Sequence, residues 1–450
     1  MHPLPTTHFT VIAPPFASHA RALEALAGGL LDQGHRVSWI HQPDAQSLVT
    51  DPRIAFHPLG GATHPPGSLA QVWARAANPG GPLGLRRVIA DVASATDMLC
   101  REGPALLRAL GTEAVIADQM EAAGGLLARG LGLPFVSVAC ALPVNRDPRV
   151  PLPVMPWGYA QDLRGEQLNA GSARVYDWLM QPHARVIAQH ARAFGLPACS
   201  TLAECLSPLA QISQTTLTFD FPRVSSVEHF HHVGPLRQPL EQEPVLDLPV
   251  DSRRPFVFAS LGTLQGGRFG LFRRIAKACR ALDAQLLLAH CDRLGAAQAD
   301  ALQRAGATWV TGFAPQRAAL ARADAVVSHA GMNTVLDALV AGTPVLALPI
   351  AFDQPGVAAR LVHAGAGLRL WPALASTAAI EKSLRRLLDE PGFAQRARTL
   401  GADVEQSGGV ARAVGIVEAA LRQHPSPTTR RTPDVAPAAA AAQAARLQAA

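Results

Sequence analysis

Lysine is almost absent from this chain of 450 residues: only Lys277 and Lys382 occur, so nearly all of the 40 basic residues are arginines. Charged residues make up 16% of the sequence, against about 25% in a typical globular protein. Together with a hydrophobic fraction of 48%, this excludes a collagen, a coiled coil and a wholly disordered chain. The arginines are scattered and form no basic stripe with interleaved aromatic residues, which argues against a nucleic-acid-binding protein.

The six cysteines contain no Cys-x-x-Cys pair, and at this length and spacing a disulfide framework is not expected. The chain also lacks a basic N-terminal segment followed by a long apolar run, so we expect no secretory signal. Its most apolar stretch, residues 340–352, is too short to cross a bilayer and contains two prolines. We therefore expect a cytoplasmic protein. Its net charge of +6 allows at most a peripheral contact with the anionic inner surface of a membrane.

What the sequence does contain is a regular alternation of short apolar segments and helical patterns. In the first half, the pattern predicts helices at 21–33 and 121–131, and strands at residues 9–13, 37–41, 114–117 and 135–139. In the second half, it predicts strands at residues 256–260, 285–289, 308–310, 325–327 and 345–348. This alternation predicts an α/β fold whose parallel sheets carry helices on both faces.

A change in composition divides the two halves. Residues 237–254 contain three prolines and little periodicity. We expect them to link an N-terminal domain, residues 1–236, to a C-terminal domain, residues 255–423. The Pro/Ala-rich tail at 424–450 is expected to be disordered, and the Pro/Gly-rich region 57–85 is expected to be a loop.

The sharpest local signal is the segment His329-Ala-Gly331-Met-Asn333-Thr334-Val-Leu-Asp337, which follows a strand and opens a helix. Free N–H groups at a helix start bind anions, and the polar Asn333 and Thr334 stand at this start. A diphosphate would fit there, with close backbone approach at Gly331 and a further donor in His329. Asp337, one turn after Asn333, is placed to accept hydrogen bonds from ribose hydroxyl groups. The alternative is an ordinary capped helix with a hydrogen-bonded histidine.

Two neighbouring features favour a nucleotide-sugar site. Phe313 and Gln316 stand just past a strand end, where the ring would stack on a base and the amide would bond the edge of that base. Asp353 and Gln354 follow the strand at 345–348 and suit the hydroxyl groups of a sugar. Open α/β sheets bind their ligands at the carboxyl ends of strands.

Two weaker features remain open. The loop at 260–266 would offer N–H groups and a hydroxyl to a phosphate through Gly262 and Thr263, but an ordinary turn explains it equally well. The cluster of three histidines suggests a metal site, although we expect a structural role for them: His229, His231 and His232.

The order and spacing of the donor residues resemble the nucleotide-sugar signature of family 1 glycosyltransferases, the UDP-glycosyltransferases. Two positions depart from that signature: Phe313 stands where many members have Trp, and Asp337 where many have Glu.

The resemblance implies the GT-B architecture, in which two doubly wound Rossmann-like domains face each other across a cleft. It places the UDP-sugar in the C-terminal domain and the acceptor in the N-terminal domain. It also implies that the last helix, within 404–422, returns to the N-terminal domain. The chain has no Asp-x-Asp motif, which argues against a metal-dependent transferase of the other major fold, and we expect no metal or other cofactor.

The same resemblance implies a catalytic base after the first strand and an aspartate that orients it. His19 and Asp118 match these positions. A histidine suits this role because its ordinary pKa lies near neutral pH. The resemblance implies a single displacement that inverts the anomeric carbon. The alternative for His19 is a residue that merely stands next to a helix N-cap.

Five longer segments resemble the carotenoid-glucosylating members of the family: residues 9–16, 118–121, 137–143, 260–266 and 351–357. This implies transfer of glucose from UDP-glucose to the ring hydroxyl groups of zeaxanthin, giving the mono- and then the diglucoside. The apolar loop 142–159 would line a cleft for such an acceptor through Met155, Trp157 and Tyr159, or it is a proline-rich surface loop packed on the domain.

Other functions stay open at this stage. One is a transferase of the same fold that acts on a macrolide, a sterol or another apolar alcohol. A second is a non-catalytic activator, which is expected to lack the base and the donor signature. A third is a sugar-nucleotide epimerase, which would need no acceptor.

Overall fold

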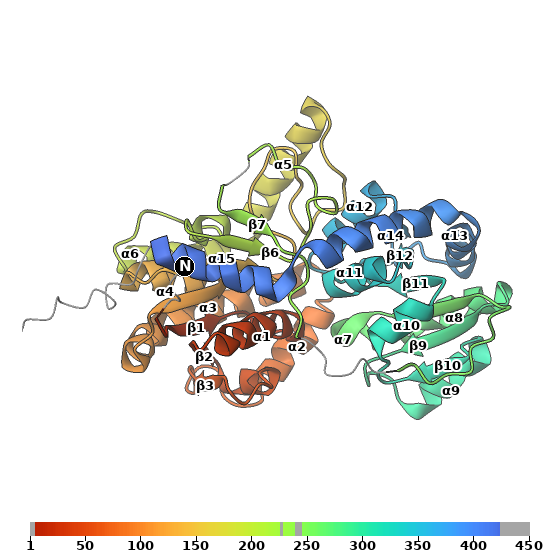
Figure 1. Cartoon of the computed structure of the whole chain (residues 1–450), viewed down its shortest axis with the longest axis horizontal. Coiled ribbons are helices and arrows are strands. Elements are labelled where there is room, and N and C mark those ends of the chain that lie inside the picture. Colours follow the sequence, from red (N-terminus) through yellow and green to blue (C-terminus); the bar gives the residue numbers. More distant parts are fainter. Residues whose placement is uncertain (1–4, 226–227, 239–244, 424–450) are drawn as a thin grey trace, which may run out of the picture.

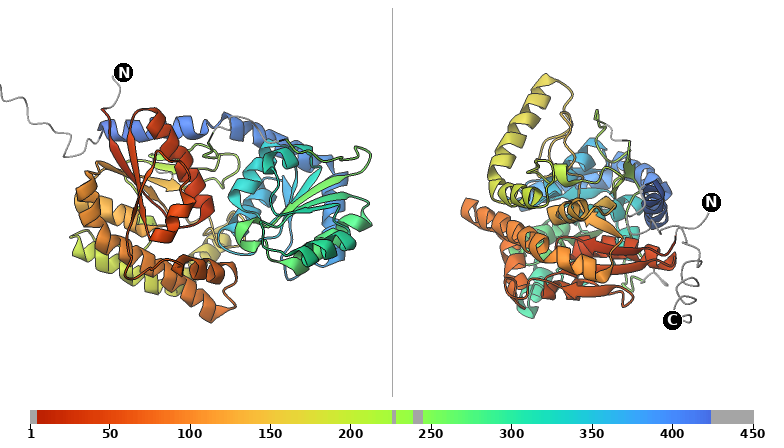
Figure 2. Two further views of the ribbon diagram at one scale, coloured as in Figure 1. Left: turned by 90° about the horizontal axis from the view of Figure 1, so that it is seen from below. Right: turned by 90° about the vertical axis from the view of Figure 1, so that its left-hand side faces the viewer.

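The computed structural model describes residues 5–225, 228–238 and 245–423, and it consists of two α/β domains, each built on a parallel sheet (Figure 1). The N-terminal sheet has seven strands in the order β3-β2-β1-β4-β5-β6-β7, and the C-terminal sheet has six in the order β10-β9-β8-β11-β12-β13. Every strand pairing is parallel. Helices cover both faces of each sheet (Figure 2). The predicted pair of doubly wound domains is thus confirmed.

The N-terminal domain follows the predicted alternation closely around its central strands. Its strands are β1 (His8–Ile12), β2 (Arg36–His41), β3 (Ala55–Pro58), β4 (Ala114–Asp118), β5 (Phe135–Ala139), β6 (Gln211–Ser213) and β7 (Phe230–His232). Its helices are α1 (Ala17–Asp32), α2 (Ser68–Ala77), α3 (Pro82–Leu110), α4 (Ala122–Leu131), α5 (Leu163–Leu179) and α6 (Gln181–Ala193), with short 3₁₀ turns η1 (Pro43–Leu48) and η2 (Ala203–Cys205).

The C-terminal domain repeats the same pattern. Its strands are β8 (Phe256–Ser260), β9 (Gln285–Ala289), β10 (Trp309–Thr311), β11 (Ala325–Ser328), β12 (Val345–Ala347) and β13 (Gly367–Arg369). Its helices are α7 (Gly262–Gln265), α8 (Phe269–Ala281), α9 (Ala296–Ala305), α10 (Gln316–Arg322), α11 (Met332–Val340), α12 (Gln354–His363), α13 (Thr377–Asp389) and α14 (Pro391–Gln406), followed by α15 (Gly409–Gln423).

Two local predictions for the N-terminal domain were wrong. Helix α1 begins at Ala17 rather than at Arg21, so His19 lies in its first turn. The region 57–85, expected to be a loop, contains α2 and the start of α3, because its prolines and glycines bound helices instead of breaking them: Pro82 is the first residue of α3 and Gly81 its N-cap. Helix α2 then reaches the other domain, where the Gln265 side chain of α7 donates to the Ala77 carbonyl over 3.1 Å.

The last helix packs on the first domain. Helix α15 lies along α1, and the buried side chains of Ala413, Val417 and Leu421 belong to the same apolar core as Phe9 on β1. Within residues 245–254, the described part of the expected linker has no helix or strand. Positions 239–244 and the tail 424–450 lie outside the described residues. Among the helices described, none combines the length and apolarity that crossing a membrane requires.

The contact between α1 and α15 allows no extra atom at Gly29. A Cβ added there would lie 2.6 Å from Cγ1 of Val410 and 2.9 Å from Cγ2 of Val414. We expect Gly29→Ala to destabilise the protein by about 1–3 kcal/mol through overpacking, less the gain in helix propensity.

The matched control is Gly415→Ala in the middle of α15, where an added Cβ would meet no atom within 4 Å. This variant is expected to be stabilised by about 0.5–1 kcal/mol. Urea denaturation measures both changes, and equal stabilisation by the two variants would contradict the packing of α15 on α1.

Candidate active site

The sheet order of the N-terminal domain brings His19 and Asp118 together. Strands β1 and β4 are neighbours, with Ile12 opposite Ala117, so the residues that follow β1 lie beside the end of β4. The imidazole Nδ1 of His19 lies 2.7 Å from Oδ2 of Asp118. The carboxylate is fully buried, whereas the His19 side chain is 13% exposed. With Nδ1–H donated to the carboxylate, Nε2 of the neutral ring carries the lone pair that accepts a proton.

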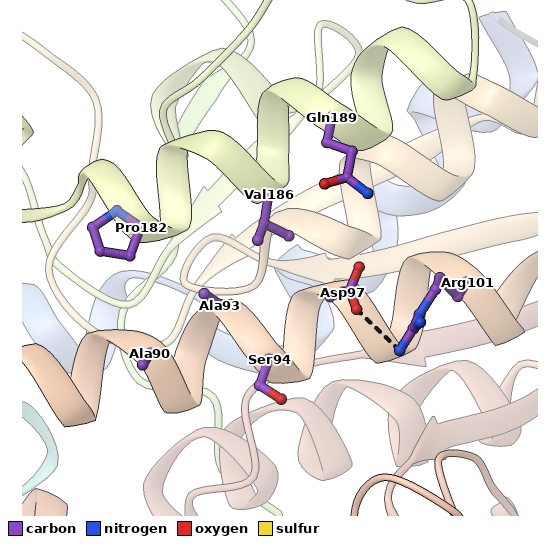
Figure 3. Close-up of a pocket in the computed structure, with 8 residues that line it drawn as sticks. All are labelled: Ala90, Ala93, Ser94, Asp97, Arg101, Pro182, Val186 and Gln189. Atoms are coloured by element: carbon purple, nitrogen blue, oxygen red, sulfur yellow. Dashed lines mark ion pairs between the residues drawn. The ribbon is translucent and has the colours of Figure 1, made fainter.

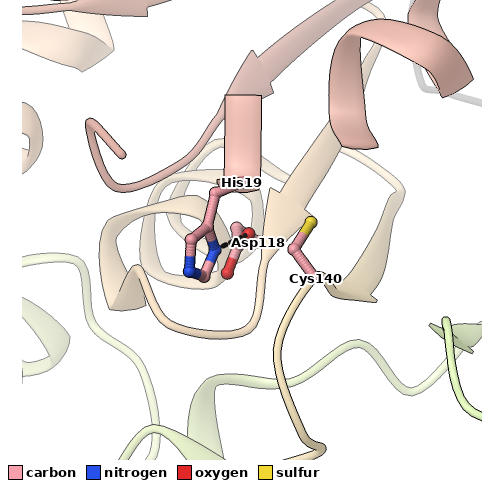
Figure 4. Close-up of side chains that lie close together, drawn as sticks. All are labelled: His19, Asp118 and Cys140. Atoms are coloured by element: carbon pink, nitrogen blue, oxygen red, sulfur yellow. Dashed lines mark hydrogen bonds and ion pairs between the residues drawn. The ribbon is translucent and has the colours of Figure 1, made fainter. Parts of the chain in front are cut away.

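The buried carboxylate of Asp118 has further partners. Its Oδ1 accepts a hydrogen bond of 2.8 Å from the Met120 backbone N–H. Figure 4 shows Cys140 as the third side chain beside His19 and Asp118. The donor atoms of these three residues lie within 4.8 Å of one another, and in the described part of the chain no other such group of potential metal ligands forms. Burial, with the neighbouring carboxylate, raises the pKa of Cys140 well above its usual range. It therefore stays a thiol, which is a poor metal ligand.

Four influences act on the pKa of His19. Burial lowers it, but the charge of Asp118, the hydrogen bond to that carboxylate and the charge of Asp353 raise it, and the net shift is upward from 6.5. The carboxylates therefore stabilise the imidazolium that forms when the ring accepts a proton. Asp353 belongs to the C-terminal domain, so the two domains meet at this histidine.

The contact between the domains is built by the start of α12. Oδ2 of Asp353 accepts a hydrogen bond of 3.1 Å from the Leu142 backbone N–H, and burial raises the pKa of Asp353. The ring of Phe352 lies 6.1 Å from that of Phe16, which precedes α1. Gln354 shapes the same turn, because its amide oxygen accepts hydrogen bonds from the backbone of residues 350 and 351.

A buried ion pair fixes the position of α12. Nε of Arg360 lies 2.6 Å from Oδ1 of Asp220 in the N-terminal domain, and each side chain is only 1% exposed. The Arg360 guanidinium also covers the ring of Phe221, 4.5 Å from its centroid. Burial raises the pKa of Asp220, but Arg360 and Arg223 outweigh this effect and lower it, so the carboxylate stays charged.

On the donor side, the backbone encloses His329. Gly262 follows β8 with φ of 75°, and a Cβ added to it would lie 2.7 Å from the imidazole. A Cβ on Gly331 would come equally close. Burial lowers the pKa of His329 to about 4, so the ring is neutral near pH 7 and offers an N–H without a charge. The predicted loop at 260–266 is in fact mostly the short helix α7, in which Thr263 is exposed.

The first turn of α11 and the start of α10 share a hydrogen-bond network. Gln316 donates to Asp337 over 2.7 Å and accepts from the Thr334 hydroxyl over 3.2 Å. Arg237 forms an ion pair with Asp337 and donates to the Asn333 carbonyl over 3.2 Å. Sequence reasoning missed Arg237, because nothing at the start of the expected linker indicates that its side chain reaches α11.

Two of the predicted donor residues are thus held by each other. Gln316 and Asp337 bond one another, whereas the sequence predicted separate contacts with the base edge and the ribose. Phe313, by contrast, is 60% exposed and available for stacking.

The three candidate acceptor residues of the loop 142–159 have separate partners. Tyr159 packs against Phe221 and His363, with ring centroids 6.0 and 6.4 Å away. Trp157 donates from Nε1 to Asn169 over 3.1 Å, and Met155 lies in a turn closed on Leu152. A surface groove of about 430 Å³ between α3 and α6 contains none of the predicted site residues (Figure 3).

Two doubly wound domains that meet beside a buried histidine–aspartate pair are the architecture of the GT-B class of glycosyltransferases. Residues 106–422 match the family model described as UDP-glucoronosyl and UDP-glucosyl transferase. The chain belongs to this family of UDP-glycosyltransferases.

Curated relatives and solved structures agree with this assignment. The zeaxanthin glucosyltransferase of Pantoea ananas is 48% identical over 92% of this chain and 95% of its own length. That of Pseudescherichia vulneris is 46% identical over 92% of this chain and 98% of its own length. The crystal structure of the glycotransferase of kitacinnamycin superposes with a TM-score of 0.71 at 19% identity, covering 92% of this chain and 99% of that one, which supports the fold.

The close fit around His329 predicts the effect of Gly262→Ala. Alanine at a positive φ costs about 1–2 kcal/mol, and its methyl group would push the imidazole out of place. We expect UDP affinity, measured by calorimetry, to fall at least about tenfold. Gly270→Ala in α8, where an added Cβ meets nothing within 4 Å, is the control and leaves the affinity unchanged. Wild-type affinity in a folded Gly262→Ala variant would exclude this arrangement from donor binding.

The raised pKa of His19 predicts the pH dependence of activity. The ring acts as a base only when neutral, so kcat/KM falls as the pH decreases through that pKa. Asp118→Asn removes the principal charge that raises the pKa, so this acidic limb moves to lower pH, while kcat falls by roughly 10²–10⁴.

Asp353→Asn gives a matched comparison, because its charge makes the smallest of the upward contributions to the pKa of His19. It is expected to move the acidic limb in the same direction by less. If the fall of kcat/KM at low pH occurs at the same pH in both variants as in the wild type, His19 is not the group that titrates.

Proposed function

We propose that this protein transfers glucose from UDP-glucose to the ring hydroxyl groups of zeaxanthin, with inversion at the anomeric carbon, giving the monoglucoside and then the diglucoside. The names of the two relatives that align over nearly their whole length support the choice of donor sugar and acceptor. The observation that carries the chemistry is the hydrogen bond of 2.7 Å between His19 and Asp118. Asp353 of the C-terminal domain lies close enough to raise the pKa of the same histidine.

The reaction follows from these groups. Nε2 of His19 takes the proton of the acceptor hydroxyl, and Asp118 stabilises the resulting imidazolium. The acceptor oxygen then forms a bond to the anomeric carbon as the bond from that carbon to the phosphate oxygen breaks, and UDP leaves with the electron pair. A single displacement on an α-linked donor gives a β-glucoside.

The departing UDP needs stabilisation of its negative charge. We assign this to the N–H groups at the start of α11, with Asn333 and Thr334, to the N–H of His329, and to Gly262 and Thr263 at the start of α7. These neutral donors make a metal ion unnecessary for the leaving group. Phe313 stacks on the base.

Contacts with the two sugars complete the donor site in this proposal. Gln316 reaches the base edge, Asp337 the ribose, and Asp353 and Gln354 the hydroxyl groups of glucose. For Gln316 and Asp337 this requires their mutual hydrogen bond to open or to be shared with the nucleotide.

The direct test is product analysis with purified protein, UDP-glucose and zeaxanthin in detergent. We expect products heavier by one and by two glucose units, with β linkages by nuclear magnetic resonance, and no loss of activity after treatment with EDTA. Parallel reactions with a macrolide and a sterol identify the preferred alcohol, and a product formed from UDP-glucose alone would indicate an epimerase.

His19→Ala separates catalysis from donor binding. The imidazole supplies the base but belongs to the acceptor domain, so the variant is expected to lose transfer by at least about 10²-fold while calorimetry still shows wild-type affinity for UDP. Full activity in this variant would remove His19 from the mechanism, and loss of UDP binding would place it in the donor site instead.

A further inference from the structure

Helix α5 projects from the body of the molecule (Figures 1 and 2). Of its 17 residues only Asn169 is buried. Four large apolar side chains of the helix are nevertheless exposed to solvent, Leu163 by 69%, Leu168 by 49%, Val175 by 57% and Trp178 by 67%. A helix with this many exposed apolar side chains needs a partner other than the domain that carries it.

The apolar side chains share one face of α5 with two cations. At 100° per residue, positions 163, 164, 168, 174, 175 and 178 fall within less than half of the helix circumference. This outer face therefore combines the four apolar side chains with Arg164 and Arg174. Among the described residues, neither arginine has an ion-pair partner.

The acidic residues of α5 point elsewhere and are neutralised. Glu166 pairs with Arg149 over 2.9 Å, and Asp177 pairs with Arg146 over 2.6 Å. Asp162, at the N-cap, accepts a hydrogen bond from the Gly165 N–H. The outer face is thus apolar and positively charged, and α5 places no carboxylate on it.

The opposite side of α5 is tied to the loop 142–159. Asn169, the one buried residue, accepts from Trp157 Nε1 over 3.1 Å and donates to the Pro148 carbonyl over 2.9 Å. The loop continues to the start of α12, where the Gly356 N–H donates to the Pro153 carbonyl over 3.1 Å. A surface bound by α5 would therefore lie next to the loop that leads to His19 and Asp353.

We propose that the outer face of α5 docks on an anionic lipid bilayer and thereby places the active site where an apolar acceptor is dissolved. The proposal rests on the proposed function for the nature of that acceptor. Leucine and tryptophan side chains insert at the boundary between head groups and acyl chains, and arginines are attracted to anionic head groups.

The size of the face argues against a second copy of the chain as the occupant. A helix of 17 residues is about 26 Å long and about 10 Å wide, so one face offers roughly 300 Å². A stable dimer needs about 800 Å² from each partner. A two-fold contact would also bring the arginines of both copies together, and their like charges would repel. Anionic head groups of a bilayer would attract them instead.

Vesicle flotation tests the docking without any acceptor. The full-length protein is expected to float with vesicles of phosphatidylethanolamine and phosphatidylglycerol, and to stay in solution with vesicles of phosphatidylcholine. Arg164→Glu/Arg174→Glu is expected to lower the affinity for anionic vesicles by at least about 25-fold, since each lost arginine accounts for roughly fivefold. Leu163→Ser/Trp178→Ser is expected to lower the affinity by at least about tenfold and to reduce flotation accordingly.

The control is Leu83→Ser/Leu374→Ser, which removes two equally exposed leucines (74% and 70%) outside α5 and leaves flotation unchanged. Equal losses in the control, or a wild-type protein that fails to float, would overturn the proposal. A dimer in light scattering that only the α5 variants dissociate would assign the face to a second copy of the chain and overturn it as well.

Activity measurements separate this proposal from the proposed function. With zeaxanthin in detergent, the α5 variants are expected to match the wild type. With zeaxanthin in anionic vesicles, their kcat/KM is expected to fall by the same factor as their vesicle affinity. A wild-type protein that floats but glucosylates nothing in detergent would contradict the proposed function alone. Variants that fail to float but keep full activity on vesicle-borne acceptor would contradict the role of the docking face.

Discussion

The proposed chemistry depends on one hydrogen-bonded pair inside the N-terminal domain, His19 and Asp118. The carboxylate is fully buried, and removing one partner of such a pair leaves a charge that costs about 3–5 kcal/mol. The pair exists because β1 and β4 are adjacent, which brings together residues 99 positions apart in the sequence. The Met120 N–H on the other carboxylate oxygen completes the environment, so the orientation of the base is set by backbone as well as by side chains.

The second constraint is the position of α12 relative to that pair. The ion pair between Arg360 and Asp220 is buried on both sides and holds this helix of the C-terminal domain against the N-terminal domain. Asp353, one position before the helix, is thereby held close enough to raise the pKa of His19. In the proposed mechanism, acceptor activation and sugar binding are thus coupled through α12. A change in the packing of α12 would alter both the base and the contacts expected for the donor sugar.

Much of the fold follows from the sequence, and the failures have physical causes. The apolar strands β5 and β8 have the predicted boundaries. Strands β6, β7 and β13 were not predicted, because each has only three residues, of which at most one is apolar apart from glycine. Helix α2 was missed because its bounding prolines and glycines resemble those of a loop. The residues His19 and Asp118 could be selected by motif. Arg237 and Arg360 could not, since their partners Asp337 and Asp220 are brought near only by the tertiary fold.

His19 and His329 show how different surroundings give one residue type two different protonation behaviours. Both are largely buried, and burial lowers the pKa of each. Only His19 has carboxylates beside it, and they reverse the shift, so this ring can take and hold a proton. For His329, burial acts without an opposing carboxylate and lowers the pKa to about 4. In the proposed donor site, the neutral ring of His329 donates its N–H to a phosphate oxygen, whereas His19 accepts a proton from the acceptor.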